Sequence, residues 1–89
     1  MGNGVYVTAA ARGQGVATAM LTQLLARVRS YPGLEQVTLS VSAPQEVARR
    51  LYHAFGFEVY GCERHALKIG ETYVDDEHMV LWLQTPPAE

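Results

Sequence analysis

Residues 5–17 read Val5-Tyr6-Val7-Thr8-Ala9-Ala10-Ala11-Arg12-Gly13-Gln14-Gly15-Val16-Ala17. A β-rich segment leads into a loop of small residues, and the loop leads into the start of a helix. Backbone N–H groups at a helix start lack partners within the helix, so together with the helix dipole they form an anion site. Gly13 and Gly15 let the backbone approach a ligand closely, and Arg12 adds a planar cation that suits phosphate oxygens. The stretch therefore predicts a cradle for a pyrophosphate.

A glycine-rich turn that only connects a strand to a helix is the alternative explanation, because glycine loops alone are weak evidence. Two common nucleotide-binding loops do not fit this segment. A Walker loop requires Gly-Lys-Ser/Thr, which the chain lacks, and the dinucleotide fingerprint requires a glycine where Thr18 stands. The predicted cradle belongs to neither of these two classes.

The hydrophobic pattern around this stretch predicts the order β-α-β-α-β-β, an α/β architecture. The expected elements are a strand over Gly4–Thr8, a loop over residues 9–15, a helix over Val16–Arg29, a strand over Gln36–Ser42, a helix from Ser42–Gln45 to Phe55, and strands over Phe57–Ile69 and Thr72–Leu83. The apolar stripes expected on the two helices consist of Val16, Met20, Leu21, Leu24, Leu25 and Val28, and of Val47, Ala48, Leu51, Tyr52 and Phe55.

Local sequence signals predict where several of these helices and strands begin or end. Residues 42–45 have the spacing of a capping box at a helix start, and Gly56 is placed to end that helix in a left-handed conformation. Gly70-Glu71 predicts a two-residue hairpin turn with glycine first. The run from Met79 to Leu83 is apolar at every position, which predicts a central strand covered on both faces.

The composition limits the classes of function that this chain can have. The chain has 89 residues, 48% of them hydrophobic, which indicates one domain with a packed core. A net charge of −2 without a basic run gives no reason to expect a nucleic-acid partner. No apolar segment is long enough to span a bilayer, and the single cysteine, Cys62, is compatible with a reducing compartment. We expect a soluble cytoplasmic protein with neither nucleic acid nor membrane as a partner.

A second motif makes the pattern specific. Ala48-x-x-Leu51-Tyr52-x-x-x-Gly56-Phe57 resembles the A-x-x-L-Y-x-x-x-G-F helix of the GNAT (Gcn5-related) N-acetyltransferase superfamily. Arg12 to Ala17 resembles the Q/R-x-x-G-x-G/A signature of the same superfamily, at a suitable distance upstream. The segment from Ala66 to Met79 is similar to the final hairpin of its amine-acetylating members, so the resemblance covers nearly the whole chain.

The resemblance implies a partial GNAT fold. Its mixed sheet would contain two parallel strands that splay apart, followed by a C-terminal antiparallel hairpin. Acetyl-CoA, the cosubstrate, would lie between the splayed strands, with its pantetheine arm bonded to the strand backbone. The resemblance assigns cofactor contacts to Val5, Tyr6, Val7, Arg12, Gly13, Gln14, Gly15, Val16, Ala17, Gln45 and Tyr52. The N–H near Val7 would polarise the thioester carbonyl. Gln45 stands where the family often has Asn.

The implied activity is transfer of acetyl from acetyl-CoA to a primary amine by direct attack. Tyr52 matches the tyrosine that the family uses as general acid toward the leaving thiolate; core packing is the alternative role for a tyrosine on an amphipathic helix. The chain offers no carboxylate near its first strand as a general base. The spacing of His53, His65 and His78 suits no metal site, so no metal is expected.

The residues that resemble the family correspond to the C-terminal, acetyl-CoA-binding half of its domain. Strands and helices that precede Val5 in the family, and that help to shape the acceptor site, have no counterpart in this sequence. We therefore expect a truncated GNAT domain over residues 1–85 and a tail over residues 86–89. The alternative function is a catalytically silent half-domain that binds CoA or a partner chain. Because the first strand would keep one open edge, a homo-oligomer formed through that strand is expected.

Overall fold

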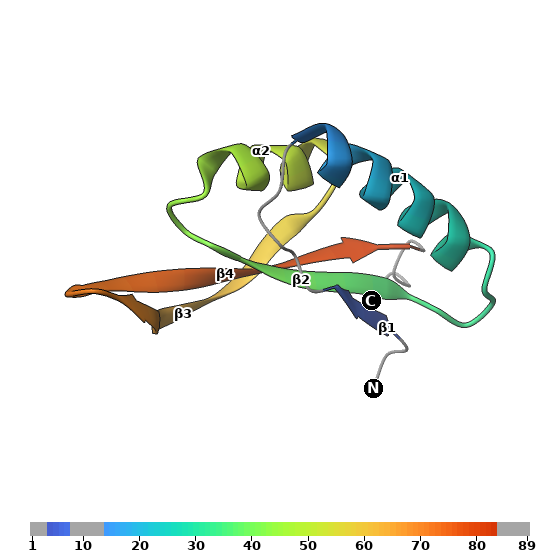
Figure 1. Ribbon diagram of the computed structural model, residues 1–89. Helices are drawn as coiled ribbons and strands as arrows, with labels where there is room; N and C mark the ends of the chain where they lie inside the picture. Colours follow the sequence, from blue (N-terminus) through green and yellow to red (C-terminus); the bar gives the residue numbers. More distant parts are fainter. Residues whose placement is uncertain (1–3, 8–13, 84–89) are drawn as a thin grey trace.

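The computed structural model describes residues 4–7 and 14–83, which form one mixed sheet with two helices (Figure 1). The elements are β1 (Gly4–Val7), α1 (Gln14–Arg29), β2 (Gln36–Ser42), α2 (Glu46–Ala54), β3 (Glu58–Ile69) and β4 (Thr72–Trp82). The four strands lie in the order β1-β2-β4-β3. The predicted order β-α-β-α-β-β is confirmed, as are the parallel pairing of the first two strands and the C-terminal antiparallel hairpin.

The strand directions explain why both helices cover the same face. β1 and β2 are parallel, and β4 runs antiparallel to both β2 and β3, so β3 is parallel to β2. The connections through α1 and α2 therefore both join parallel strands, and both advance in the same direction across the sheet. Such crossovers are right-handed in nearly all proteins. Two right-handed crossovers in one direction place both helices on one face, as Figure 1 shows.

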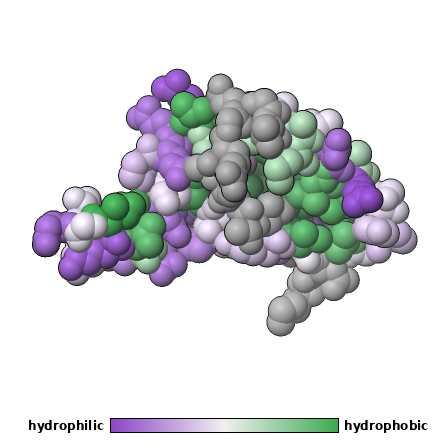
Figure 2. Space-filling view, in the orientation of Figure 1, coloured by the Kyte–Doolittle hydropathy of each residue, from purple (hydrophilic) through white to green (hydrophobic). Residues whose placement is uncertain are grey.

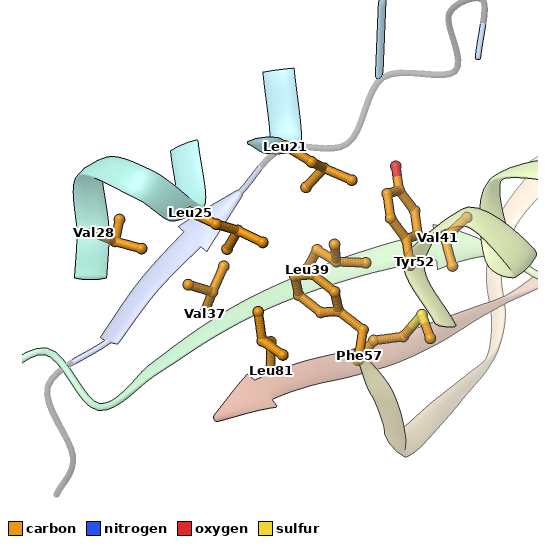
Figure 3. Packing of buried hydrophobic residues seen from close by; sticks show 10 residues of the cluster. Leu21, Leu25, Val28, Val37, Leu39, Val41, Tyr52, Phe57 and Leu81 are labelled. Atoms are coloured by element: carbon orange, nitrogen blue, oxygen red, sulfur yellow. The ribbon is translucent and has the colours of Figure 1, made fainter. Parts of the chain in front are cut away.

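The strand β2 supplies the centre of the core. Its residues alternate between buried and half-buried, and Val37, Leu39 and Val41 point toward the helices (Figure 3). Across the strand pair, Leu81 and Met79 of β4 lie opposite Val37 and Leu39 on the same face. The predicted strand over Gln36–Ser42 is confirmed at both ends, because strict alternation leaves one register that buries the apolar side.

The helices bury narrower stripes than expected. Leu21, Leu25 and Val28 of α1 are buried over the sheet, whereas Met20 is 59% exposed. On α2, Tyr52 is buried while Val47 is 55% exposed. Including Met20 and Val47 in the apolar stripes was wrong, because each lies beside the stripe that the helix turns toward the sheet. Val16 has no described side chain.

The start of α2 also differs from the prediction. Ser42 remains the last residue of β2, and its hydroxyl donates to the carboxylate of Asp76 at 3.4 Å. The N-cap residue is Gln45, which makes no side-chain capping hydrogen bond. The predicted capping box at residues 42–45 is therefore wrong, because the strand pairing with β4 holds Ser42 in the sheet.

The apolar end of β4 is covered less completely than predicted. β4 lies between β2 and β3, which confirms a central strand, and Met79, Val80 and Leu81 are buried. Trp82, however, is 47% exposed. The expectation of full cover on both faces is wrong at Trp82, which shares a face with the buried Val80 but lies beyond the pairing with β3, because the first residue of β3, Glu58, pairs with Val80.

The hairpin of β3 and β4 extends beyond the rest of the sheet. The pairing of β4 with β2 ends at Asp76, and residues 72–74 pair only with β3 among the described strands. Figure 2 shows hydrophobic side chains at this projecting end, where Leu67, Ile69 and Tyr73 are exposed. Gly70, with φ +61°, opens the predicted two-residue turn between Ile69 and Thr72.

Gly56 ends α2 in the conformation predicted for it. Its φ is +102°, and a Cβ there would meet Leu81 Cδ1 at 3.0 Å. Backbone strain and a close contact thus both oppose a side chain at this position. Gly70 has positive φ but no atom within 4 Å of such a Cβ, and Gly61 has neither constraint.

Substitutions at these three glycines distinguish the cost of backbone strain from the cost of a steric contact, because Gly56 has both constraints, Gly70 has the strain alone and Gly61 has neither. We expect Gly56→Ala to lower the free energy of unfolding by about 1–3 kcal/mol, and Gly70→Ala by about 1–2 kcal/mol. Gly61→Ala, the matched control, should change it by less than about 1 kcal/mol. Urea unfolding followed by circular dichroism measures all three. An unchanged stability for Gly56→Ala would contradict the left-handed end of α2.

Candidate functional site

The carboxyl ends of β1 and β2 define the candidate site. The two strands pair in parallel from Gly4 opposite Gln36 to Val7 opposite Leu39, so both end at the same edge of the sheet. The chain leaves this edge toward α1 after β1 and toward α2 after β2. Ligands of α/β sheets bind outside the carboxyl ends of the strands, where helix starts gather. The fold therefore places the starts of α1 and α2 each after a strand that ends on this side of the sheet.

The predicted contact residues of β1 lie on different faces. Val5 is half-buried and packs against the core. Tyr6 is 60% exposed on the face away from the helices, and its hydroxyl lies 2.8 Å from that of Ser40. Val7 pairs with Leu39, beyond which β2 continues through Ser42 without a β1 partner among the described residues. This part of β2, which has no described partner on the β1 side, fits a ligand that bonds along a strand.

The glycine loop is described in part. Arg12 and Gly13 lie outside the described residues, whereas Gln14, Gly15, Val16 and Ala17 form the first turn of α1. The helix thus begins two residues earlier than predicted. The first turn contains no acidic residue, and the last turn carries Arg27 and Arg29. No carboxylate of the first turn opposes an anion at this helix start, so the first turn fits a phosphate-bearing ligand.

Tyr52 lies on the side of α2 that faces the sheet. It is 5% exposed, and its ring meets that of Phe57 edge-on at 6.0 Å between centroids. In Figure 3 its ring stands beside Leu39 and Val41, with the hydroxyl pointing away from β2. Burial raises the pKa of the Tyr52 phenol above its ordinary value of 10.0. The phenol is therefore protonated at neutral pH, as a proton donor must be.

Gln45 stands at the entrance to α2. Its backbone carbonyl accepts the first helical hydrogen bond, from the N–H of Arg49 at 3.0 Å. Because its side chain caps nothing, the amide is not committed to the helix end. Gln45, at the N-cap, and Tyr52, near the end of α2, are thus connected through one short helix.

Two polar contacts at this edge were not predicted from the sequence. Arg49 of α2 donates to the carboxylate of Glu77 on β4 at 3.1 Å and to the carbonyl of Ala43 at 2.9 Å. Tyr6 and Ser40 form the second contact, on the opposite face. Both depend on which residues of neighbouring strands lie opposite each other. No local sequence signal carries that register.

The histidines take separate positions. His78 Nε2 lies 3.6 Å from the Glu63 carboxylate, and its ring is tilted against that of Tyr60. The His65 backbone N–H donates to Asp75 at 2.9 Å, and the His65 ring stacks on Tyr73. Within residues 4–7 and 14–83, no three His, Cys, Asp or Glu side chains are grouped to hold a metal ion.

Neither described helix is long and apolar enough to cross a membrane. α1, the longer of the two, has 16 residues.

Comparison with solved structures identifies relatives of this fold. The chain is similar to NAA60 of Arabidopsis thaliana in complex with a bisubstrate analogue, with a TM-score of 0.78 and 23% identity over 91% of this chain and 50% of that one. It is also similar to a phosphinothricin acetyltransferase of Sinorhizobium meliloti in complex with AcCoA, with a TM-score of 0.70 and 25% identity over 89% and 44% of the two chains. A third match is yncA of Salmonella typhimurium with its cofactor acetyl-CoA, with a TM-score of 0.72 and 22% identity over 88% and 44%.

The present chain spans about half the length of each of these structures. The model of the acetyltransferase (GNAT) family matches residues 2–57, which include β1, α1, β2 and α2. This match contains both sequence motifs and the carboxyl ends of β1 and β2. The chain belongs to the acetyltransferase (GNAT) family.

Proposed function

We propose that this chain binds acetyl-CoA and takes part in transfer of its acetyl group to a primary amine. The observation that carries the proposal is the position of Tyr52, buried on α2 above β2, where the parallel strands β1 and β2 end. In this proposal, residues 1–85 act as part of an acetyltransferase domain and residues 86–89 as a tail.

The cofactor contacts follow the two strand ends. The backbone of β2 beyond Leu39, together with Val5, Tyr6 and Val7 of β1, would bond the pantetheine arm. Arg12, Gly13 and the first turn of α1, from Gln14 to Ala17, would hold the pyrophosphate. The uncommitted amide of Gln45 would add a hydrogen bond at the start of α2.

Acetyl-CoA supplies an activated acetyl group and a thiolate as leaving group. Tyr52 would hold a proton close to the sulfur that receives negative charge when the amine displaces it. Burial favours the neutral phenol, so the proton remains in place until that charge develops. A group that acts only on developing charge raises the rate more than the affinity.

A catalytically silent half-domain is the second candidate. The observation that favours it is length: the chain covers only 44% to 50% of the three acetyltransferase structures compared above. Such a module would bind CoA, or a partner chain, and transfer no acetyl group.

Acetyl-CoA binding and turnover together separate the two functions. Calorimetry with acetyl-CoA and a thiol-release assay with a panel of amines are the measurements. Binding with thiol release on at least one amine supports the transferase, and binding without release on any amine supports the silent module. If acetyl-CoA does not bind, both cofactor proposals fail.

A variant in α1 tests the pyrophosphate assignment. Gly15→Leu should abolish acetyl-CoA binding while the protein stays folded, because a bulky side chain would occupy the space that the phosphates need. Ala19→Leu adds the same bulk at an exposed position one turn later and should bind normally. Equal affinity of the two variants in calorimetry would remove the first turn of α1 from the site.

Replacing the Tyr52 hydroxyl tests its role as general acid. We expect Tyr52→Phe to lower kcat by about 10²-fold or more, with a much smaller change in the KM for acetyl-CoA. Tyr31→Phe, at an exposed position after α1, is the matched control and should keep the parent kcat. Steady-state thiol release measures both constants. A parental kcat for Tyr52→Phe would leave Tyr52 with a packing role only.

We also propose a homo-oligomer formed through the first strand. Among the described strands, β1 pairs only with β2, and its other edge has no described partner. Sedimentation at micromolar concentration should show a dimer or larger species, and Tyr6→Lys should weaken it, because a charged side chain disfavours edge pairing. Tyr60→Lys, equally exposed on β3, is the control. A parent protein that sediments as a monomer would contradict the interface.

A further inference from the structure

Two adjacent arginines of α2 have very different surroundings. The Arg49 side chain is 32% exposed and the Arg50 side chain 83%. Arg50 lies 3.9 Å from Glu46 of its own helix, an exposed pair of the kind that contributes little. Arg49 instead reaches another layer of the fold, where Glu77 is 19% exposed.

The Arg49 guanidinium joins three elements. Its Nε donates to Glu77 of β4 at 3.1 Å, and a terminal nitrogen donates to the Ala43 carbonyl at 2.9 Å. Ala43 belongs to the connection between β2 and α2, and its own N–H donates to the Asp75 carbonyl of β4 at 2.8 Å. The Ala43 residue is thus held on both sides, by the sheet through its N–H and by α2 through its carbonyl.

These contacts lie where the apolar core ends. Glu77 is opposite Val41, the last buried residue of β2, on the face covered by α2. Beyond this point Ser42 and Asp76 face each other, and neither is apolar. The start of α2 is therefore fixed to the sheet by a charged fork in addition to hydrophobic packing. A planar guanidinium bonds a carboxylate and a carbonyl with donors held in a rigid fork, whereas the ammonium group of lysine is a compact charge on a flexible stem without that fixed geometry.

Tyr52 follows Arg49 by three residues, so the two side chains leave neighbouring positions on the helix surface. α2 has only nine residues, and a shift of its first turn therefore moves Tyr52 as well. We propose that Arg49 is a positioning residue, which fixes α2 relative to β2 and β4 and thereby sets the places of Gln45 and Tyr52. This inference rests on the proposed function for its catalytic consequence and on geometry for its structural one.

Three variants and one control test the fork. Arg49→Met keeps the stem and removes both bonds, Arg49→Lys keeps the charge without the fork, and Glu77→Gln removes the carboxylate charge. Arg50→Met is the matched control on the same helix. The first measurement is the spectrum of folded protein labelled with ¹³C-tyrosine and ¹⁵N, in which the Tyr52 ring and the Gln45 amide are assigned. The second is steady-state thiol release with acetyl-CoA.

We expect Arg49→Met to shift the Tyr52 ring signals and the Gln45 amide, and Arg50→Met to leave both at parental positions. Glu77→Gln should shift the same signals in the same direction. In the kinetic assay, displacement of Tyr52 by about 1 Å should lower kcat roughly 10- to 100-fold in Arg49→Met. Arg49→Lys should recover only part of the loss, since it restores one bond of the two.

The spectra overturn the inference if Arg49→Met merely unfolds more easily while Tyr52 and Gln45 keep their parental signals. A residue that adds only to global stability behaves in that way. If Arg49→Met does not fold, Arg49→Lys and Glu77→Gln decide by the same spectra. If the parent chain neither binds acetyl-CoA nor releases thiol, the proposed function fails while the spectra still support or overturn the positioning role.

Discussion

The arrangement of the helices on the sheet depends on the two strand-helix-strand connections, which are both right-handed and both advance in the same direction across the sheet. Because β1, β2 and β3 are parallel and advance across the sheet, α1 and α2 share one face, and both begin at the same edge. The core residues Val37, Leu39, Val41, Met79 and Leu81 point toward that face, whereas Tyr6, Ser40, Val80 and Trp82 lie on the other face of the described sheet. The candidate site lies at the carboxyl ends of β1 and β2 because these strands are parallel and each leads into a helix, whereas the handedness decides which face of the sheet the helices cover.

The core that results is one-sided and ends abruptly. From Val37 to Val41 the contact between sheet and helices is apolar, and past Val41 it becomes the Arg49–Glu77 pair. A partly buried ion pair adds direction to a contact, because a guanidinium fork bonds only in certain orientations. Hydrophobic packing alone is non-directional and would hold α2 without fixing its lengthwise position as closely. The change from one kind of contact to the other occurs close to Tyr52, the residue proposed here as the general acid.

The sequence alone supports much of this fold, and the reasons differ among elements. Alternation fixes β2 at both ends, because shifting Val37, Leu39 and Val41 by one residue would expose all three. Gly56 and the Gly70 turn follow from backbone sterics, which act within a few residues. The GNAT motifs name the candidate site, yet periodicity could not exclude Met20 and Val47 from the buried stripes, because their exposure depends on how each helix is rotated against the sheet.

Other features have no local cause. Ser42 stays in the sheet because Asp76 lies opposite it. This pairing prevents Ser42 from capping α2, so the capping pattern at residues 42–45 does not form. The same register places Glu77 below Arg49, 28 residues away along the chain. Such contacts arise only when the hairpin of β3 and β4 is aligned with β2. These contacts can therefore be identified in the structure but cannot be predicted from any short stretch of the sequence.

The shortness of β1 has a consequence for how a ligand and the fold affect each other. β1 has four residues, one neighbouring strand and an exposed Tyr6, so it loses the fewest contacts when it detaches. Segments of this kind open at a lower free-energy cost than the core, and their amides exchange with solvent sooner. A ligand bonded at the ends of β1 and β2 would stabilise only the paired arrangement and would shift the local equilibrium by mass action. Ordering of this strand and occupancy of the strand ends are thus thermodynamically linked, with each favouring the other.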